Sequence, residues 1–495
     1  MTKSSHRYTA EDIRERFTSA IGKTAGELDT KGILSGSTAH KNKGRIGAVI
    51  EQSVLGYPAD NRQEPDLIID ETEWELKTTG LIAATRSDSW RAKEPVSITA
   101  VSPNRIVGEE FSTSTFWHKA ERLLVVYYLY VKPGKGMAAS YASFEIKGYD
   151  LHEWSSIDKK RLEADWTTIR DYVRTALAGD KEALLPGLST LINPRLLYLG
   201  TSPKYPNAPR FRLKSSLVTQ MARERLDDNL KMIPDNHEID SSDQFNAHLG
   251  SIASQLHDKT LAEYATLFHL PFDADGRRDN KALAEQVIVR LFTGQPGKMS
   301  QVPLFVKAGF QLKTVVLTVK GGRTEDMKLS PAIDFDEMCD PDTEFEDSSF
   351  ASIFLDSTII VAVFKEPYDN CPLHACQFQG FKRFWLGKYI DEAQRLWSQM
   401  RRLIFSGTLI DEPICDKSGN QRFTPKTGIP MTAPNWPKSR DGVLFVRGSG
   451  NDATKKPVTV NGIKMYHQNL WIKGTDVAIH LGMTDYIGQR ATLTF

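Results

Sequence analysis

The sequence predicts a mixed α/β protein of two related domains, each a mixed β-sheet flanked by helices. A chain of 495 residues exceeds the size at which one hydrophobic core usually keeps growing. Helical stripes of apolar residues alternate along it with short strand patterns. Features of the first half recur in the second half in the same order, so we expect the second domain to be a degenerate copy of the first.

The composition is that of an ordinary folded protein. Apolar residues make up 40% of the chain and charged residues 25%. The formal net charge of +1 neither demands nor excludes a polyanionic partner, so a nucleic-acid site would need locally concentrated basic residues. Residues 1–21 contain no apolar run long enough for a signal peptide or a membrane span. We therefore expect a cytoplasmic protein with no membrane partner.

Cysteine and glycine patterns exclude several classes of protein. Four cysteines in a chain of this length do not form a disulfide framework and suit a reducing compartment. Cys371, His374 and Cys376 follow a Cys-x-x-His-x-Cys pattern, but structural zinc sites usually pair two such groups of ligands, so we predict no structural zinc. No Gly-rich loop of the phosphate-cradling type is present, so no nucleotide cofactor is expected.

The first domain is expected to begin with two helices. Thr9 can cap a helix over 10–21, in which Ile13, Phe17 and Ile21 recur at four-residue spacing. A polar loop then leads to a second helical stripe over 44–55. Glu51 lies just beside that stripe.

A hairpin and a central strand should follow. The runs 66–69 and 73–78 are joined by an acidic turn, which favours a hairpin. Because strand side chains alternate, Trp74 and Leu76 should face one way, and Glu75 and Lys77 the other. The apolar run 123–129 lacks alternation, as a strand covered on both faces does. A further helix is expected over 161–177.

The second half repeats these features. A polar, acidic stretch over 234–243 marks the boundary, so we expect a first domain at 1–230 and a second at 245–495. The alternative is a chance recurrence of short apolar and lysine-bearing strands. The matching segments are 284–286 with 50–52, 309–314 with 73–78, Phe345, Ser348 and Phe350 with Phe111, Ser114 and Phe116, and 470–473 with 211–214.

One group of residues suggests chemistry. Asp66, Glu75 and Lys77 should meet across the hairpin, and oxygen ligands of this kind select hard cations such as Mg²⁺. A cation there could polarise a phosphoryl oxygen and lower the pKa of a bound water, while the lysine neutralises developing charge. The alternative is a solvated sheet face, because this spacing also occurs in unrelated strands.

Neighbouring residues strengthen the catalytic interpretation through a resemblance. The segment over 16–221 resembles the MutH family, which includes a mismatch-repair nicking enzyme and restriction endonucleases that cut at GATC. This family belongs to the PD-(D/E)xK nuclease superfamily. The residues that carry the resemblance are Lys43-Gly44-Arg45-Ile46-Gly47, Glu51, Pro65-Asp66, Glu75-Leu76-Lys77-Thr78, Phe111, Ser114 and His118-Lys119.

The resemblance implies a restriction-endonuclease-like fold and Mg²⁺-dependent hydrolysis of double-stranded DNA. It implies that Asp66 and Glu75 bind the metal and that Lys77 is the motif lysine. Glu51 would be the helix glutamate that completes the metal shell, and Lys43 and Lys119 would support catalysis or hold the DNA backbone. The loop over 200–208, where the family places base-contacting residues, departs from the family pattern. The residues expected near DNA are Arg45, Lys204, Arg210, Arg212 and Lys214.

The second domain lacks the acids of the first. Gln311 stands opposite Glu75 and Val302 opposite Asp66, and neither can replace a carboxylate as a ligand for Mg²⁺. We therefore expect this domain to be catalytically silent and either DNA-binding or regulatory; the alternative is a purely structural lobe.

The length of the chain favours the two-domain restriction enzymes of the family. The expected function is that of a type II restriction endonuclease that cuts a short palindrome, GATC or a close variant, as a transient homodimer on DNA. Two alternatives stay open: a strand-nicking mismatch-repair endonuclease, and a DNA-binding regulator that does not cleave.

Overall fold

The computed structural model describes residues 6–35, 44–58, 64–83, 90–131, 140–178, 188, 192–202, 208–234, 238–273, 282–323, 325–341, 343–416, 418–424, 428–450 and 455–488. The chain forms two compact units. Unit 1 consists of Met1–Ala247 and Thr293–Gln311, and unit 2 of His248–Phe292 and Leu312–Phe495. The segment 293–311, which we expected in the second domain, thus belongs to unit 1. Over the described residues, no helix combines the length and the apolar character needed to cross a bilayer.

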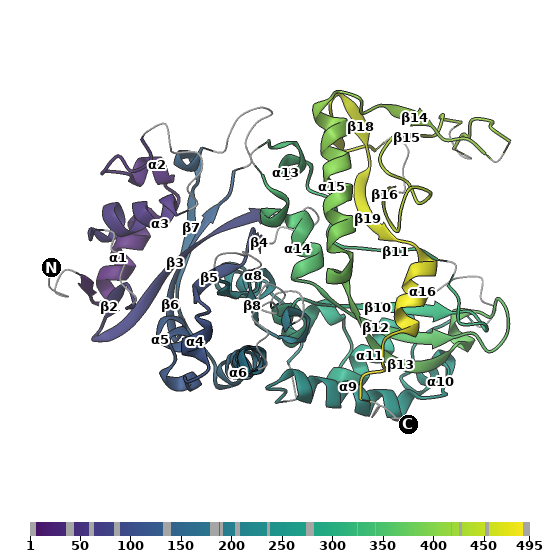
Figure 1. Cartoon of the computed structure of the whole chain (residues 1–495), viewed down its shortest axis with the longest axis horizontal. Helices are drawn as coiled ribbons and strands as arrows, with labels where there is room; N and C mark the ends of the chain where they lie inside the picture. The colour runs from purple at the N-terminus through teal and green to yellow at the C-terminus, as the bar shows by residue number, and fades with distance from the viewer. Residues whose placement is uncertain are drawn as a thin grey trace. The chain divides into compact units, whose positions relative to one another are not determined.

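The main sheet of unit 1 is mixed, and the expected hairpin and central strand are confirmed (Figure 1). Its strands follow the order β1-β2-β3-β6-β7, and β4 pairs with β3. The β2–β3 and β6–β7 pairs are antiparallel, whereas β1–β2 and β3–β6 are parallel. The strands are β1 (Arg7–Tyr8), β2 (Leu67–Ile69), β3 (Thr72–Ala83), β4 (Trp90–Ala92), β6 (Arg122–Leu129) and β7 (Ile146–Glu153).

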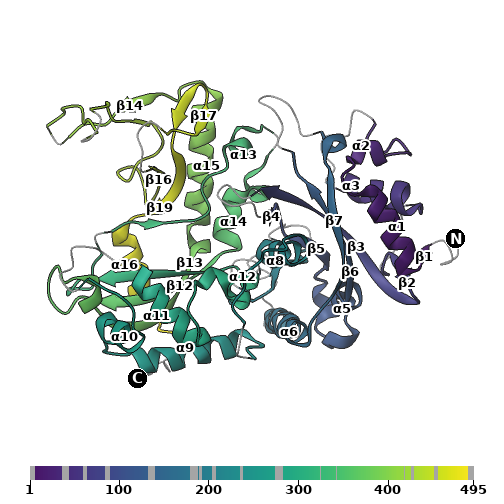
Figure 2. The same ribbon diagram turned by 180° about the vertical axis from the view of Figure 1, so that it is seen from behind.

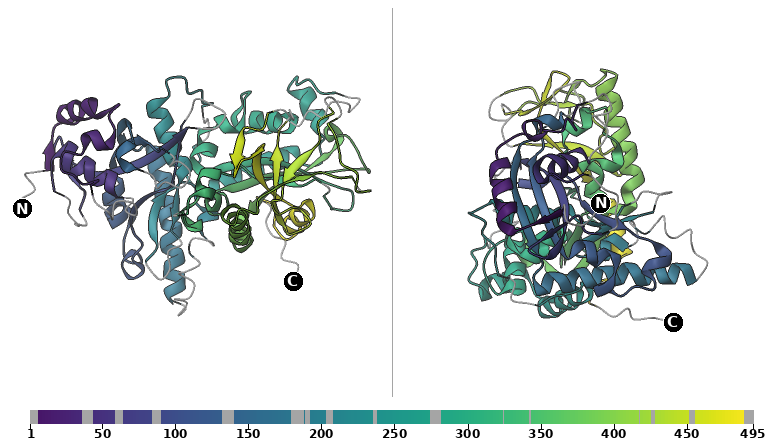
Figure 3. Two further views of the ribbon diagram at one scale, coloured as in Figure 1. Left: turned by 90° about the horizontal axis from the view of Figure 1, so that it is seen from above. Right: turned by 90° about the vertical axis from the view of Figure 1, so that its left-hand side faces the viewer.

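Three N-terminal helices cover one face of this sheet (Figures 1 and 3). Ile13 and Phe17 of the first helix are buried in one core with Trp74 and Leu76, and each such side chain contributes about 1.5–3 kcal/mol. The Thr9 cap is confirmed, but the helix ends at Ala20, so Ile21 is exposed rather than part of the apolar stripe. The helices are α1 (Ala10–Ala20), α2 (Ala25–Leu28) and α3 (Arg45–Val49), which continues as a π-helical turn (Ile50–Leu55).

The opposite face carries further helices and a second sheet in the order β5-β9-β8. Ser114 caps α5, because its hydroxyl oxygen accepts from the Trp117 amide at 3.0 Å and its O–H donates to the Phe111 carbonyl at 2.7 Å. The expected helix over 161–177 is confirmed and is longer. These elements are β5 (Val96–Ala100), α4 (Pro103–Ile106), α5 (Thr115–Ala120), α6 (Ser156–Ala178), β8 (Leu199–Thr201), β9 (Arg210–Leu213) and α8 (Ser215–Leu226).

The segment 293–311 is held in unit 1 by polar contacts of α12 (Pro303–Ala308). The ammonium of Lys307 lies 3.0 Å from Oδ2 of Asp158, whose Oδ1 accepts from the Tyr198 hydroxyl at 2.6 Å. The Ser216 hydroxyl donates to the Lys307 carbonyl at 2.9 Å. A largely buried ion pair and a hydrogen bond to a backbone carbonyl therefore tie this segment to α6 and α8.

Unit 2 has its own sheets, with strand orders β10-β12-β13 and β11-β19-β16. Figure 2 labels β12 and β13 of the first sheet and β16 and β19 of the second. Its core gathers side chains from α13, α14 and α15 against β12 and β16. The elements of the second half are α9 (Ser242–Leu256), α10 (Leu261–Leu267), α11 (Ala282–Thr293), β10 (Phe310–Leu317), β11 (Met327–Lys328), α13 (Phe335–Cys339), α14 (Ser349–Leu355), β12 (Thr358–Lys365), β13 (Gln377–Trp385), α15 (Ile390–Phe405), β14 (Asp411–Pro413), β15 (Thr432–Pro434), β16 (Leu444–Ser449), β17 (Val458–Val460), β18 (Ile463–Met465), β19 (His467–Ile472) and α16 (Gly474–Gly482).

The second half repeats the first in the order and pairing of its elements. The order β10-β12-β13 corresponds to β3-β6-β7, and β11-β19-β16 corresponds to β5-β9-β8. Helices α14, α15 and α16 occupy the sequence places of α5, α6 and α8. Ser348 also repeats the Ser114 cap, accepting from the Ala351 amide at 3.1 Å and donating to the Phe345 carbonyl at 2.6 Å. The expected degenerate copy is confirmed at the level of the fold.

Cys371 and Cys376 flank a short 3-10 turn in unit 2. Their sulfur atoms are 3.1 Å apart, and both side chains are buried. The ring of His374, between them in sequence, lies against Phe272 at a centroid distance of 5.4 Å. The two thiols therefore face each other.

Candidate active site

The β2–β3 hairpin brings Asp66 beside Glu75. Leu67 pairs with Trp74 in the antiparallel register, so the residue before β2 lies next to the residues that follow Trp74. The Leu76 amide donates to Oδ2 of Asp66 at 2.9 Å, which fixes this carboxylate at the edge of the hairpin. The hairpin thus places two carboxylates close together.

Glu75 is a buried carboxylate with two cationic partners. Its residue is only 3% exposed. Lys77 Nζ lies 2.7 Å from Oε1, on the same face of β3 as the alternation predicts, and Lys119 Nζ of α5 lies 3.1 Å from Oε1 and 3.2 Å from Oε2. Burial of a lone carboxylate is costly, so the two ammonium groups stabilise its charge and fix its orientation.

The negative charge of Asp66 is less well compensated than that of Glu75. Burial is the largest cause, and repulsion from Glu75 the next, of a rise in the pKa of Asp66 to about 6; Lys77, the Leu76 amide and Lys119 act in the opposite direction. Two neighbouring carboxylates that raise a pKa in this way would be stabilised by a cation that binds both.

Glu51 lies in the same electrostatic neighbourhood. It belongs to the π-helical turn, a feature often found at functional sites, and its backbone carbonyl accepts from the amides of Gly56 and Tyr57. Burial, followed by the charges of Asp66 and Glu51, raises the pKa of the Tyr57 phenol above its ordinary range, and Glu75 adds to the effect. The acids named from the sequence therefore all act on one buried phenol.

Asp66 and Glu75 suit a hard cation that keeps part of its water shell, rather than a metal ion enclosed by protein ligands alone. Among the described residues, no three His, Cys, Asp or Glu side chains are grouped so that they could hold a metal ion. Mg²⁺ is commonly held by one or two carboxylates while it keeps several waters and takes substrate phosphate as a further ligand. The donor set present here suits that mode, with Glu51 outside the group formed by the other two acids.

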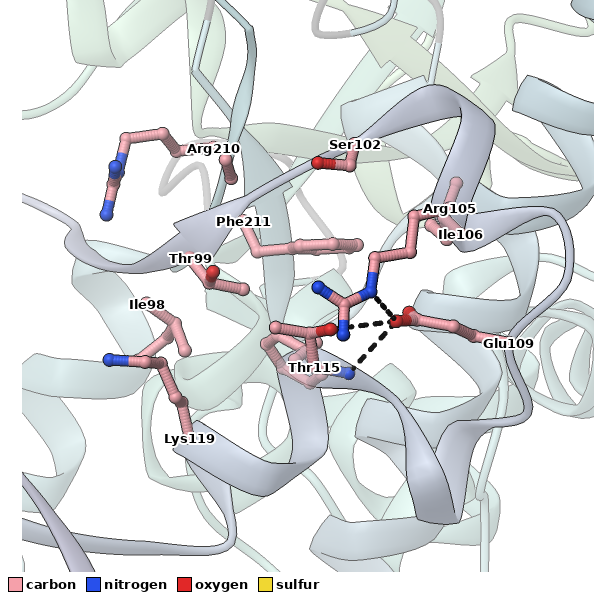
Figure 4. A pocket seen from close by; sticks show the side chains of 12 residues that line it. Ile98, Thr99, Ser102, Arg105, Ile106, Glu109, Thr115, Lys119, Arg210 and Phe211 are labelled. Atoms are coloured by element: carbon pink, nitrogen blue, oxygen red, sulfur yellow. Dashed lines mark hydrogen bonds and ion pairs between the residues drawn. The ribbon is translucent and has the colours of Figure 1, made fainter. Parts of the chain in front are cut away.

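A cavity of about 270 Å³ in unit 1 includes Lys119 in its lining (Figure 4). Residues of β5, α4, α5 and β9 form its walls, and Phe211 and Thr115 line its interior. Arg105 Nε lies 3.1 Å from Oε1 of Glu109, which also accepts from the Thr115 hydroxyl at 2.8 Å. Lys119, Arg105 and the exposed Arg210 outnumber the one carboxylate, so the cavity favours an anionic ligand.

The other residues expected near DNA differ in their surroundings. Arg45 is the first residue of α3 and is half-buried, with one guanidinium nitrogen 3.4 Å from the Leu34 carbonyl. Arg210 and Arg212 lie on β9, the first exposed and the second half-buried. Lys43 and Lys204 lie outside the described residues.

Lys214 does not suit the phosphate contact expected of it. The residue is 2% exposed, and its ammonium donates to the Leu196 carbonyl at 2.6 Å. It also helps to lower the pKa of the fully buried Asp165, which burial raises to about 6. Lys214 precedes α8 as its N-cap residue, and its stem is enclosed by the fold, so the basic strand pattern identified its position but not its burial.

Sequence patterns did not single out Tyr57, His6 or Arg105. Tyr57 follows Gly56, which ends the π-helical turn in the left-handed conformation, and its ring stacks on His6 at 4.2 Å. His6 Nδ1 lies 2.9 Å from the Asp66 backbone carbonyl. Nothing in local spacing marks such contacts, because they join residues that are far apart in the chain.

The corresponding place in the second half is built differently. Val302 is the N-cap of α12, which ends just before β10, so a helix replaces the strand that positions Asp66. Burial and the charge of Lys328 lower the pKa of the retained Lys313, while Glu285 raises it. The described surroundings of Lys313 are therefore richer in positive charge than those of Lys77.

Residues 55–165 match the family model described as DNA mismatch repair enzyme MutH. The matched span contains Asp66, Glu75, Lys77 and Lys119. The chain is also 22% identical over 511 residues to the "Type II restriction enzyme Sau3AI" of Staphylococcus aureus, across 94% of this chain and 96% of the relative. This second similarity extends through both halves of the chain.

Proposed function

We propose that this chain is a MutH-like type II restriction endonuclease that hydrolyses phosphodiester bonds in double-stranded DNA with Mg²⁺. The observation that carries the proposal is the hairpin arrangement of Asp66 and Glu75, with Lys77 and Lys119 bound to the buried Glu75 carboxylate. Similarity to a restriction enzyme over almost the whole chain favours a restriction endonuclease over a strand-nicking mismatch-repair endonuclease.

Each side chain has a distinct role in this proposal. Asp66 and Glu75 hold the cation, which when bound supplies a Lewis acid and lowers the pKa of a coordinated water. Lys77 lies close enough to Glu75 to orient the attacking water and to neutralise charge on the phosphoryl group. Lys119 and Lys43 support this arrangement or hold the DNA backbone, and Glu51 contributes from the π-helical turn as an outer carboxylate.

The proposed target is a short palindrome, GATC or a close variant, read through base edges in the major groove. Arg45, Arg210, Arg212 and Lys204 are the proposed DNA contacts, and the cavity beside Lys119, which Arg210 also lines, favours an anionic ligand. Lys214 is left out of this set because of its burial.

The second half is proposed to be catalytically silent and to bind DNA or regulate the first. Gln311 and the helix at Val302 replace the two acidic positions, whereas Lys313 and Lys328 leave positive charge that suits phosphate. Because one active site cuts one strand, a transient homodimer on DNA would supply the second cut.

The decisive experiment is plasmid cleavage by the full chain, with Mg²⁺ or with EDTA, followed by sequencing of the ends. Asp66→Ala should abolish cleavage, and Glu71→Ala, which removes an exposed carboxylate from the hairpin turn, should not. Linear fragments with defined ends support a restriction enzyme and reveal the site. Nicked circles alone would instead favour the strand-nicking enzyme, and uncut plasmid that the protein still binds would favour the regulator.

A further inference from the structure

The hydroxyl of Tyr57 is buried without a hydrogen-bond partner among the described residues. The residue is 3% exposed. A buried hydroxyl that makes no hydrogen bond costs about 1–3 kcal/mol, so a phenylalanine at this position would be more stable. A water or an ion can satisfy a buried group of this kind.

Two chains of contacts link Tyr57 to the candidate active site. Its amide donates to the Glu51 carbonyl at 3.0 Å, and its ring stacks on His6 at 4.2 Å. His6 in turn is hydrogen bonded through Nδ1 to the backbone carbonyl of Asp66 at 2.9 Å. Tyr57 is therefore linked directly to the backbone of Glu51, and through His6 to the backbone of Asp66.

Three acids act electrostatically on the phenol of Tyr57. After burial, the largest causes that raise the pKa of Tyr57 are the charges of Asp66 and Glu51, and Glu75 acts in the same direction. A phenol is uncharged at physiological pH. A neutral hydroxyl can accept a hydrogen bond there without adding another anion.

We infer that Tyr57 is a positioning residue of the cation site, where its hydroxyl accepts a hydrogen bond from the hydration shell of the cation bound by Asp66 and Glu75. This inference rests on the proposed function. Mg²⁺ keeps several of its waters in protein sites, and the hydrogens of those waters need acceptors. His6 fixes the ring by stacking and holds the Asp66 backbone through Nδ1, so the hydroxyl and the carboxylate keep a constant relation.

The test compares Tyr57→Phe with Tyr127→Phe. Tyr127 on β6 is also buried, and its hydroxyl also lacks a partner among the described residues, but Asp150 and Glu224 are the acids that raise its pKa. Both substitutions remove one unsatisfied hydroxyl and keep the ring. They should leave the melting temperature without Mg²⁺ unchanged or higher.

Calorimetric titration with Mg²⁺ gives the discriminating readout. Tyr57→Phe should raise the dissociation constant for Mg²⁺ about 2–10-fold, the effect of one ordinary hydrogen bond. Its cleavage rate should fall by a similar factor at low Mg²⁺ and recover at high Mg²⁺, whereas Tyr127→Phe should match the wild type in both respects.

Two outcomes overturn different claims. If Tyr57→Phe binds Mg²⁺ as tightly as the wild type, Tyr57 only fills the core and the inference is wrong. If the wild type binds Mg²⁺ with a dependence on Tyr57 but leaves plasmid uncut, the cation site stands and the proposed endonuclease function fails.

Discussion

Lys119 Nζ lies 3.1 Å from Oε1 of Glu75, although the two residues are 44 positions apart in the chain. One belongs to a short helix and the other to the longest strand of the main sheet. The docking of α5 on the sheet therefore supplies the second ammonium at the candidate active site, in addition to Lys77 on the same strand as Glu75.

Replacement of Lys119 should affect both stability and cleavage. Lys119→Met removes a charge-assisted hydrogen bond to a buried carboxylate, which should lower the free energy of unfolding by about 1–3 kcal/mol. The cleavage rate should fall at least about tenfold, because a positioned charge near the reacting phosphate is lost. Urea denaturation and single-turnover cleavage measure the two effects.

Lys147→Met is the matched control for this change. Lys147 Nζ lies 2.8 Å from Oε1 of Glu145, and both side chains are more exposed than those of Lys119 and Glu75. Loss of such a pair should cost no more than about 1 kcal/mol and leave cleavage unchanged. Equal effects of the two substitutions on cleavage would contradict a special role for Lys119.

Asp66 should make the metal-free protein less stable as the pH rises. Its pKa in the folded protein is about 6, above the ordinary value of 3.8. Below pH 4 the group is protonated in both states and has no effect. Between pH 4 and pH 6 the unfolded chain ionises first, and above pH 6 the full cost, on the order of 3 kcal/mol, opposes folding.

Asp66→Asn tests this cost. The variant should match the wild type near pH 4 and be more stable at pH 8 without Mg²⁺, as measured by urea denaturation with EDTA present. Addition of Mg²⁺ at pH 8 should stabilise the wild type and not the variant. A constant difference between the two proteins across this pH range would show that Asp66 does not titrate near pH 6.

The two serine caps offer a comparison within one chain. Ser114→Ala and Ser348→Ala remove the same pair of hydrogen bonds from α5 and α14, so each should cost about 0.5–2 kcal/mol. Of these two helices, α5 carries Lys119, which contacts Glu75. Ser114→Ala should therefore slow cleavage, and Ser348→Ala should leave the catalytic step unaltered. Identical cleavage rates would mean that the position of α5 does not limit catalysis.

Lys307 should stabilise unit 1 only while Asp158 is ionised. Burial raises the pKa of Asp158, but Lys307 and the Tyr198 hydroxyl outweigh it and hold the pKa below 3.8. The stabilising effect is thus present above pH 4 and lost as the pH falls through the depressed pKa. Lys307→Met should lower the free energy of unfolding by about 3–5 kcal/mol at pH 7, with a smaller loss at pH 3. A loss that does not depend on pH would point to packing of the lysine stem instead.

Local patterns predicted the helices, the hairpin and the faces of β3, because period and capping depend on neighbours in the sequence. The Thr9 cap, the opposite orientation of Trp74 and Glu75, and the central position of β6 all follow from such rules. The repeat could also be predicted, since the Ser114 and Ser348 caps preserve their spacing from Phe111 and Phe345.

The features that could not be predicted from the sequence depend on long-range packing. Lys214 fits a basic strand pattern, yet its ammonium is enclosed beside Leu196 because of how β8 and α8 pack. The stacking of His6 on Tyr57 joins residues 51 positions apart and leaves no local signal. The sequence does not predict that 293–311 belongs to unit 1, because this depends on the long-range contact between Lys307 and Asp158.

The position of 293–311 in unit 1 limits where the chain can be truncated. A chain cut near position 230 would retain Asp158 and Ser216 but lose the ammonium and the carbonyl of Lys307 that they bind. Deletion of the whole second half would thus remove contacts that stabilise unit 1, whatever that half itself binds. The presence of the second half is therefore not by itself a sign of a second activity, because part of it stabilises unit 1.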